Sequence, residues 1–404
     1  MNMTKTNAGP PKRRVLWLVA GGLCSFLLVA LGWYLWERFA PPKPFGKVVT
    51  LAGTGARIGP QKTLSDPFGV AADGDTIYVT DGLGGSLYRV SLKGEVELIT
   101  DQLDMPSHLA VAPDGSLIVA NTGAHTIVKV DPKSKAVSVI AGRPNASGNA
   151  DGKGSEARFR APMGVVVDKQ GVIFVADTYN DRIRRIEKDG TVTTIAGSIQ
   201  GSHGGKGSEA QFNTPCAVAF GIDEKELLVA DTGNDAIRHV SVAGDVSPVI
   251  ANGQGGETAA TPTIRAPIAI LKTGEEEAYI AGAGEAPIYF SKSGKAPSHR
   301  APATDTFDAP GVYSIAGGRG AGLMDADMTT AQFNRPAGLA LVGKNTLVVA
   351  ESGNGLLRAI VPANASIGAK SDPALATLKA EDIRKAVLPR WPYDPPEAKR
   401  EIAG

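Results

Sequence analysis

Tryptophan and cysteine are scarce in this sequence of 404 residues, and both are placed unevenly. Three of the four tryptophans, Trp17, Trp33 and Trp36, lie near the N-terminus, and the fourth is Trp391. Cys216 is the one cysteine beyond residue 40. That part of the chain therefore has no internal disulfide and depends on its packed core for stability.

An excess of basic charge is also missing. The chain has 42 Lys and Arg against 41 Asp and Glu, a formal net charge of +1. Because a nucleic-acid surface needs clustered positive charge, we expect no nucleic-acid partner. The 49 glycines and 27 prolines, beside 43% hydrophobic residues, indicate a turn-rich globular chain rather than a disordered one.

One long hydrophobic run is present, at residues 15–36, where Ser25 is the single clearly polar side chain. A helix of this length spans a bilayer, and tryptophans stand near both ends, where interfacial rings are favoured. We predict a transmembrane signal anchor. A cleaved signal peptide is the competing interpretation, but the run is long and no A-x-A cleavage site follows it.

The charges that flank this run predict its orientation. Basic residues precede the run, whereas Glu37 and Arg38 follow it and cancel. The positive side faces the cytoplasm, so residues 1–14 are expected there. Residues 37–46 then form a linker, and the rest of the chain is expected in the periplasm or outside the cell. The basic residues are Lys5, Lys12, Arg13 and Arg14.

A unit that opens on a proline recurs six times over residues 47–365. A second strand ends 14 to 16 positions after each proline, and two more strands follow between Gly, Asp-Gly or Asn turns. Six units of four antiparallel strands predict an all-β, six-bladed β-propeller. The prolines are Pro67, Pro106, Pro162, Pro215, Pro267 and Pro336, and the second strands end at Asp81, Asn121, Asp177, Asp231, Gly282 and Glu351.

The two ends of the repeat array complement each other. The sixth unit lacks a fourth strand after Ile360, whereas residues 48–53, VVTLAG, form a strand before the first unit. We predict that this N-terminal strand completes the sixth blade. Main-chain pairing would then close the ring and remove the open sheet edges of a linear array.

These units resemble the NHL repeat, over residues 48–362. The resemblance is clearest in the third unit and recurs at Asp231, Thr232 and Asn234, whereas the fifth unit has Gly282 in place of the acidic residue. It implies a six-bladed propeller, and the missing tryptophans argue against tryptophan-aspartate repeats. Members of this family and its structural relatives include protein-binding scaffolds, lactonase-like hydrolases and an amidating lyase, so the fold leaves the function open. The matching residues of the third unit are Pro162, Gly164, Ala176, Asp177, Thr178, Asn180, Arg182 and Ile183.

One rim of the propeller is expected to collect the candidate binding residues. Because adjacent strands are antiparallel, the proline openings, the second-strand ends and the inter-blade loops share that rim. Three of the loops, after Gly142, Gly197 and Gly318, are long and glycine-rich, as binding loops often are. The candidates are Asp81, Asn121, Asp177, Asn180, Asp231, Asn234 and Glu351.

A structural role for these carboxylates and amides is the favoured alternative. An Asp followed by Thr-x-Asn caps its own turn by accepting backbone N–H groups. A lactonase-like metal site also needs acidic or amide groups on the innermost strands, and those strands are apolar here. We therefore expect no metal and no cofactor.

His108 is the candidate catalytic residue. It stands where three other units have Gly69, Gly164 and Gly338, and we expect it near the channel mouth. A lone histidine there would act as a base or a zinc ligand, yet no second histidine stands at a ligand spacing. Cys216 is expected to be buried as a small apolar residue.

Residues 366–404 form a tail beyond the propeller. Residues 373–387 have apolar side chains at helical spacing, and Trp391 and Tyr393 follow in a proline-rich stretch suited to anchoring a partner. Packing of the tail on the propeller is the alternative. We predict a membrane-tethered, non-enzymatic propeller that binds a protein through its rim loops or this tail. A gluconolactonase-type hydrolase that works at the channel mouth is the alternative.

Overall fold

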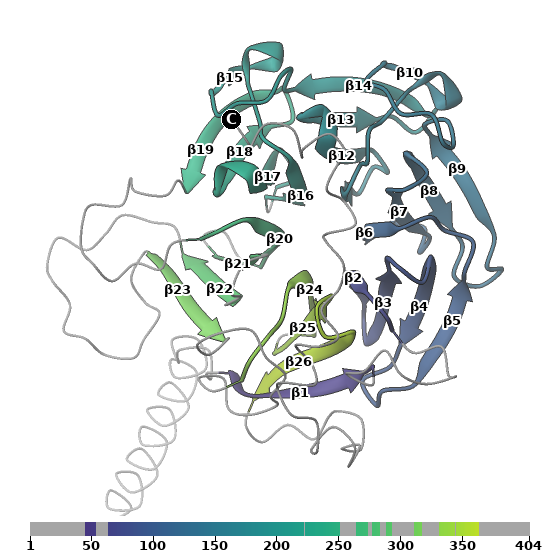
Figure 1. Cartoon of the computed structure of the whole chain (residues 1–404), viewed down its shortest axis with the longest axis vertical. Coiled ribbons are helices and arrows are strands. Elements are labelled where there is room, and N and C mark those ends of the chain that lie inside the picture. The colour runs from purple at the N-terminus through teal and green to yellow at the C-terminus, as the bar shows by residue number, and fades with distance from the viewer. Residues whose placement is uncertain are drawn as a thin grey trace, which may run out of the picture. The chain divides into compact units, whose positions relative to one another are not determined.

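The computed structural model describes residues 45–53, 64–221, 223–250, 264–273, 277–282, 288–292, 311–316, 331–343 and 345–362. These residues form six antiparallel sheets arranged as blades around a central channel (Figure 1). The predicted anchor at 15–36 and the tail at 366–404 lie outside the described residues. Within the described residues, no helix is both long and apolar enough to cross a membrane.

The strands of each blade follow one another outward from the channel, as the six proline-opened units predict. Blade 1 contains β2 (Pro67–Asp73), β3 (Thr76–Asp81), β4 (Ser86–Val90) and β5 (Val96–Thr100). Blade 2 contains β6 (Pro106–Val111), β7 (Leu117–Asn121), β8 (Thr126–Val130) and β9 (Val137–Ala141). Blade 3 contains β11 (Gly164–Val167), β12 (Ile173–Asp177), β13 (Arg182–Ile186) and β14 (Thr191–Ala196).

The other three blades repeat this order. Blade 4 contains β16 (Pro215–Phe220), β17 (Glu226–Asp231), β18 (Ala236–Ser241) and β19 (Asp245–Ile250). Blade 5 contains β20 (Pro267–Lys272), β21 (Glu277–Gly282), β22 (Ile288–Lys292) and β23 (Gly311–Ala316). Blade 6 contains β24 (Pro336–Val342), β25 (Thr346–Glu351) and β26 (Leu356–Pro362), and its outermost strand is β1 (Phe45–Ala52).

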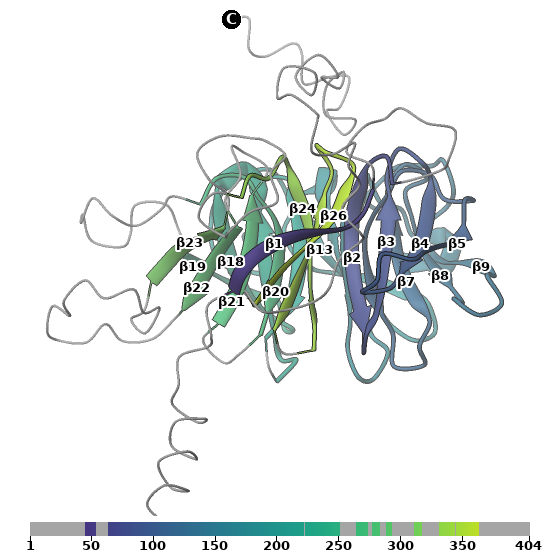
Figure 2. The same cartoon turned by 90° about the horizontal axis from the view of Figure 1, so that it is seen from below.

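Strand β1 closes the ring in the predicted way. It pairs antiparallel with β26, with Val48 opposite Ile360 and Thr50 opposite Arg358. Figure 2 shows β1 crossing the outside of blade 6 beside β26. Two segments that lie more than 300 positions apart in the sequence therefore share one sheet, and the edge of β26 is covered.

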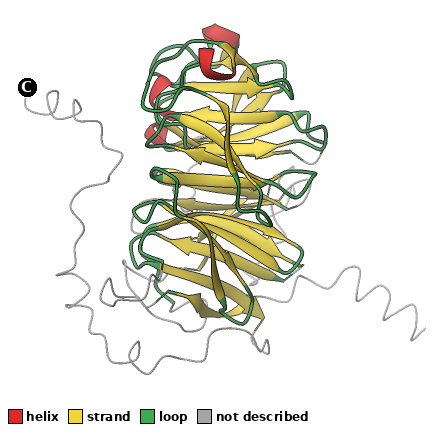
Figure 3. Ribbon diagram, turned by 90° about the vertical axis from the view of Figure 1, so that its right-hand side faces the viewer, coloured by secondary structure: helices red, strands yellow, loops and turns green. Residues whose placement is uncertain are grey.

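Blades 3 and 4 depart from the prediction of four strands. The loop before each blade contributes a two-residue strand, β10 (Gly152–Lys153) or β15 (Gly205–Lys206), which pairs with the outer strand β14 or β19. A short 3₁₀ helix follows each, η1 (Gly154–Glu156) and η3 (Gly207–Glu209), and two more, η2 (Thr178–Asn180) and η4 (Thr232–Asn234), follow β12 and β17. Figure 3 shows these short helices beside the edge-on sheets. The two long loops are thus partly regular structure that covers a sheet edge.

Six hydrophobic clusters hold neighbouring blades together, one between each pair. Strand β7 shows the reason, because its side chains alternate between two neighbours. Leu117 and Val119 pack in the cluster toward blade 1, whereas Ile118 and Ala120 pack in the cluster toward blade 3. The middle strands are consequently apolar on both faces.

Candidate functional site

The acidic candidates on the rim are buried, and they bind the loop that enters their own blade. Asp177 accepts the backbone N–H of Arg160 at 2.8 Å, the Asn180 side chain at 2.8 Å and Arg184 at 2.6 Å. Arg184 in turn lies over the ring of Phe159, 5.0 Å from its centroid. We call this set of acid, arginine and phenylalanine a clamp, because it ties strands two and three of a blade to the incoming loop.

The clamp recurs in blades 4 and 6. Asp231 accepts the N–H of Asn213 at 2.7 Å, the Asn234 side chain at 2.8 Å and Arg238 at 3.2 Å. In blade 6 the same three bonds run to Glu351 from the Asn334 N–H, from Asn354 and from Arg358. The corresponding rings, Phe212 and Phe333, lie 5.6 Å and 4.6 Å from the guanidinium carbons of Arg238 and Arg358.

Burial governs the electrostatics of these acids. It raises the pKa of Asp177 to about 6 and of Glu351 to about 7, against the lowering influence of Arg184 and Arg358. The pKa of Asp231 is raised for the same reason, against Arg238. Each acid has its hydrogen bonds made within the protein, so the geometry gives it a structural role. A binding role for these residues stays a prediction.

Blades 1 and 2 have the same acceptor without the arginine. Asp81 accepts the backbone N–H groups of Ser65 at 2.7 Å, Asp66 at 3.0 Å and Gly84 at 3.0 Å. Asn121 accepts the N–H of Asp104 at 2.7 Å. The expectation that each acid caps its own turn is therefore met through Gly84 in blade 1. It is wrong for Asp177 and Asp231, which accept no backbone N–H of their own turn but bind the asparagine side chain of that turn, the preceding loop and an arginine.

Rim turns also bind the next blade directly. The Thr122 hydroxyl donates to the carbonyl oxygen of Pro162 at 2.7 Å, and Thr232 does the same to Pro267 at 2.6 Å. Asp181 accepts the backbone N–H of Thr214 at 2.7 Å. The Thr and Asp residues of the repeat thus connect blades, a role that its sequence spacing alone does not reveal.

The channel is closed on the rim side by a plug, which we define as Phe68, Met163, Cys216, Ile268 and Ala337. Each residue directly follows the opening proline of its blade, and all five are at most 4% exposed and pack as one cluster. Burial raises the pKa of the Cys216 thiol to about 12, so Cys216 is the buried apolar residue that was expected.

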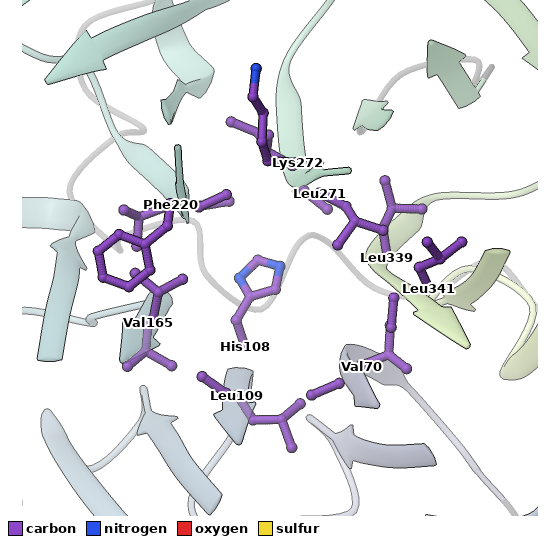
Figure 4. A pocket seen from close by; sticks show the side chains of 18 of the residues that line it. Val70, His108, Leu109, Val165, Phe220, Leu271, Lys272, Leu339 and Leu341 are labelled. Carbon is purple, nitrogen blue, oxygen red and sulfur yellow. The ribbon is translucent and has the colours of Figure 1, made fainter. Parts of the chain in front are cut away.

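His108 lies directly beside this plug, in the middle of the channel (Figure 4). Its Nε2 is 2.9 Å from the carbonyl oxygen of Ala337, and its ring packs edge-on to Phe68 with centroids 5.2 Å apart. A carbonyl oxygen only accepts, so Nε2 carries the hydrogen. Burial lowers the pKa of His108, against the effect of nearby carbonyl oxygens, and thereby favours the neutral form of the ring.

A pocket of about 510 Å³ extends from His108 along the channel, away from the plug. Its lining continues to Gly221, Glu224 and Thr273, which lie just past the ends of the innermost strands β16 and β20. The pocket therefore opens on the face opposite the proline openings. The expectation that His108 stands at a channel mouth on the loop-bearing rim is wrong, because the plug separates it from that rim.

Among the residues that the structure describes, few side chains in the channel could bind a metal or take part in catalysis. No three His, Cys, Asp or Glu side chains come together there as a metal-binding group. His239 pairs with the exposed Glu226 at 2.5 Å on the outer part of blade 4, and His125 accepts the N–H of Ala161 at 3.1 Å. The tail candidates Trp391 and Tyr393 lie outside the described residues.

Sequence reasoning missed the clamp and the plug, although both leave a signal. Phenylalanine stands three positions before the opening proline in blades 3, 4 and 6, the same three blades in which arginine occupies the strand-three position of Arg184. The residue after the opening proline is apolar in five of the six units. Neither pattern shows which residues these side chains contact, because the contacts join residues that lie far apart in one repeat or in different repeats.

Comparison with known proteins finds a family that matches part of the chain and longer proteins of similar sequence. Residues 55–197 match the family described as SMP-30/Gluconolactonase/LRE-like region. The chain is 36% identical over 170 residues to NHL repeat-containing protein 2 of Gallus gallus, covering 41% of this chain and 22% of that protein. It is 26% identical over 420 residues to Protein SUPPRESSOR OF QUENCHING 1, chloroplastic, of Arabidopsis thaliana, covering 88% of this chain and 39% of that protein. The chain thus spans well under half the length of these relatives.

Solved structures support the fold. A Bacteroides thetaiotaomicron protein of unknown function superposes with a TM-score of 0.59 at 15% sequence identity, over 78% of this chain and 76% of that chain. At this level of identity the similarity shows the shared propeller architecture alone.

Proposed function

Because the chain is a six-bladed β-propeller with NHL-type repeats, we propose that it is a non-enzymatic scaffold that binds a protein on its rim. The plug is the observation that carries this proposal. It fills the rim end of the channel with buried apolar side chains, so the rim offers a surface rather than a reaction cleft. Ile199 and Leu83 add exposed apolar side chains in rim loops, 64% and 48% exposed.

The proposal includes a membrane tether and a fixed orientation. Residues 15–36 would hold the chain in the membrane, with the N-terminus in the cytoplasm and the propeller in the periplasm or outside the cell. The support is the uninterrupted apolar run and the basic residues before it. Trp391 and Tyr393 in the tail would add a second contact with the partner.

Three matched variants of the full chain test the rim. We expect a protein partner captured by crosslinking to be lost with Ile199→Asp and with Leu83→Asp, which place a charge on the rim. Val139→Asp is the control, because Val139 is 49% exposed on β9, outside the rim loops. Equal capture by all three variants would contradict a rim interface, and deletion of residues 370–404 tests the tail separately.

A lactonase-like hydrolase is the second candidate. It is favoured by the family match over residues 55–197 and by a histidine that borders a pocket. The full chain would be assayed on lactones with Ca²⁺, Mg²⁺ or Zn²⁺ added, and we expect no turnover above background. Turnover that His108→Ala abolishes and His239→Ala retains would establish the hydrolase and overturn the scaffold proposal.

A further inference from the structure

The channel pocket is blind and built from every blade. Its wall combines one innermost strand from each of the six blades, β2, β6, β11, β16, β20 and β24. The plug closes one end beyond His108, and the other end opens opposite the rim. A volume of about 510 Å³ falls within the range of small-molecule sites, roughly 300–1,000 Å³. Because one end is closed, a polypeptide cannot pass through the channel.

The pocket wall is almost entirely uncharged. Apolar side chains surround His108 in Figure 4, whereas Lys272 points away from the ring. Among the lining residues that the structure describes, Glu224 and Lys272 carry the only formal charges, and both lie at the open end. Glu224 already forms an ion pair with Lys169 at 3.4 Å. The apolar wall residues include Val70, Leu109, Val165, Phe220, Leu271 and Leu339.

The inner end of the pocket is formed by a fixed, neutral ring. The bond from Nε2 to Ala337 and the edge-on contact with Phe68 set the orientation of the His108 imidazole. A neutral ring surrounded by apolar side chains favours an apolar or planar group beside it. A charged group buried at this depth would lose its hydration without gaining a counter-ion, which is strongly unfavourable.

We propose that this pocket binds a neutral, predominantly apolar small molecule, which enters from the face opposite the rim and rests against His108. The site is distinct from the rim interface, because the plug lies between them. The protein would therefore hold a small ligand on one face and a protein partner on the other.

A pair of fluorescent probes that differ in charge tests the proposal. The neutral probe is N-phenyl-1-naphthylamine, and the anionic one is 8-anilino-1-naphthalenesulfonate. We expect the full chain to bind the neutral probe saturably at one site and the anionic probe at least tenfold more weakly. Equal affinity for the two probes would overturn selection for a neutral ligand, and the lack of a saturable component would overturn the site itself.

A channel-filling variant locates the binding. Ala110 lines the pocket on β6, so Ala110→Trp is expected to weaken binding of the neutral probe at least tenfold. Ala136→Trp places the same side chain at an exposed position between β8 and β9 and should bind as the wild type does. Residues 15–36 are common to all variants, so the difference between them reports the channel. Equal binding by Ala110→Trp and Ala136→Trp would overturn the assignment.

A second, milder variant keeps the test informative if Ala110→Trp does not fold. If Ala110→Trp does not unfold cooperatively, Ala72→Leu narrows the same pocket from β2 with a smaller change. In the wild type, the neutral probe should raise the unfolding temperature, and in the filled variant this shift should vanish. A shift of the same size in both proteins would place the probe elsewhere.

Discussion

Blades 3 and 2 are neighbours with the same strand order, yet their rims are held together differently. Blade 3 has a buried clamp, in which Asp177 pairs with Arg184 over the ring of Phe159. In blade 2 the acceptor is Asn121, and Val128 occupies the position of the arginine, opposite Val119 as Arg184 is opposite Val175. Leu103 replaces the phenylalanine, three residues before the opening proline.

The difference shows that two positions of the repeat change together, the buried arginine of strand three and the phenylalanine before the blade. An arginine occupies the buried strand-three position of Arg184 where phenylalanine precedes the blade, in blades 3, 4 and 6, and an acid ends strand two in those blades, as it also does in blade 1. In blades 1, 2 and 5 the arginine position is occupied by Tyr88, Val128 and Tyr289, and the phenylalanine position by Leu64, Leu103 and Ile264. A buried arginine is tolerated only with its acid and its aromatic ring, because a lone buried charge is too costly.

The largest expected effect comes from removing the acid of one clamp. Asp177→Ala removes the fully buried counter-ion of Arg184 and leaves only the half-exposed Asp151, at 2.7 Å, so we expect a loss of about 3 kcal/mol in the free energy of unfolding. Asn121→Ala in blade 2 removes a neutral acceptor and should cost about 1–2 kcal/mol. Urea denaturation of both variants measures the difference. Losses of equal size would show that the clamp adds nothing beyond the shared hydrogen bond to the loop.

A smaller effect is expected when blade 3 receives the residue that blade 2 has. Phe159→Leu removes part of the buried ring and its contact with the Arg184 guanidinium, and should cost about 1–2 kcal/mol. In an Arg184→Met background the same substitution should cost about 0.5–1 kcal/mol less, because the cation is gone. A cost that does not depend on the background would mean that Phe159 acts by packing alone.

The smallest expected effect is on the pH dependence of stability. The folded-state pKa of Glu351 is raised to about 7 from the ordinary value of 4.5, so the folded protein holds this proton more tightly than the unfolded chain does. The resulting stabilisation is complete below about pH 4.5 and is lost as the pH rises through 7.

Glu351→Gln isolates this contribution, because glutamine does not titrate. The decline in unfolding free energy between pH 5.5 and 8 should be shallower in this variant than in the wild type. Glu209→Gln, at an exposed position in η3, is the control and should follow the wild type. A wild-type slope retained in Glu351→Gln would refute the assignment of this titration to Glu351.

Much of the fold could be predicted because its signals are local. The proline openings, the alternating strands and the strand-ending turns lie within a few residues of each other, and they predict the strands that the structure shows. The closing strand was recognisable because residues 48–53 had strand character and the sixth unit lacked one strand. The extra strands β10 and β15 were not predicted, since two residues in a glycine-rich loop have no detectable period.

The sequence by itself determined the six-fold repeat, the apolar inner strands and the burial of Cys216, because each follows from periodicity or residue type. Tertiary structure alone decided the partners of the rim acids and the face on which the channel opens. Asp177 binds a loop residue and an arginine that the repeat pattern does not connect to it. Similarly, the plug forms only where five residues from five blades meet on the channel axis, and no segment of the sequence contains that meeting point.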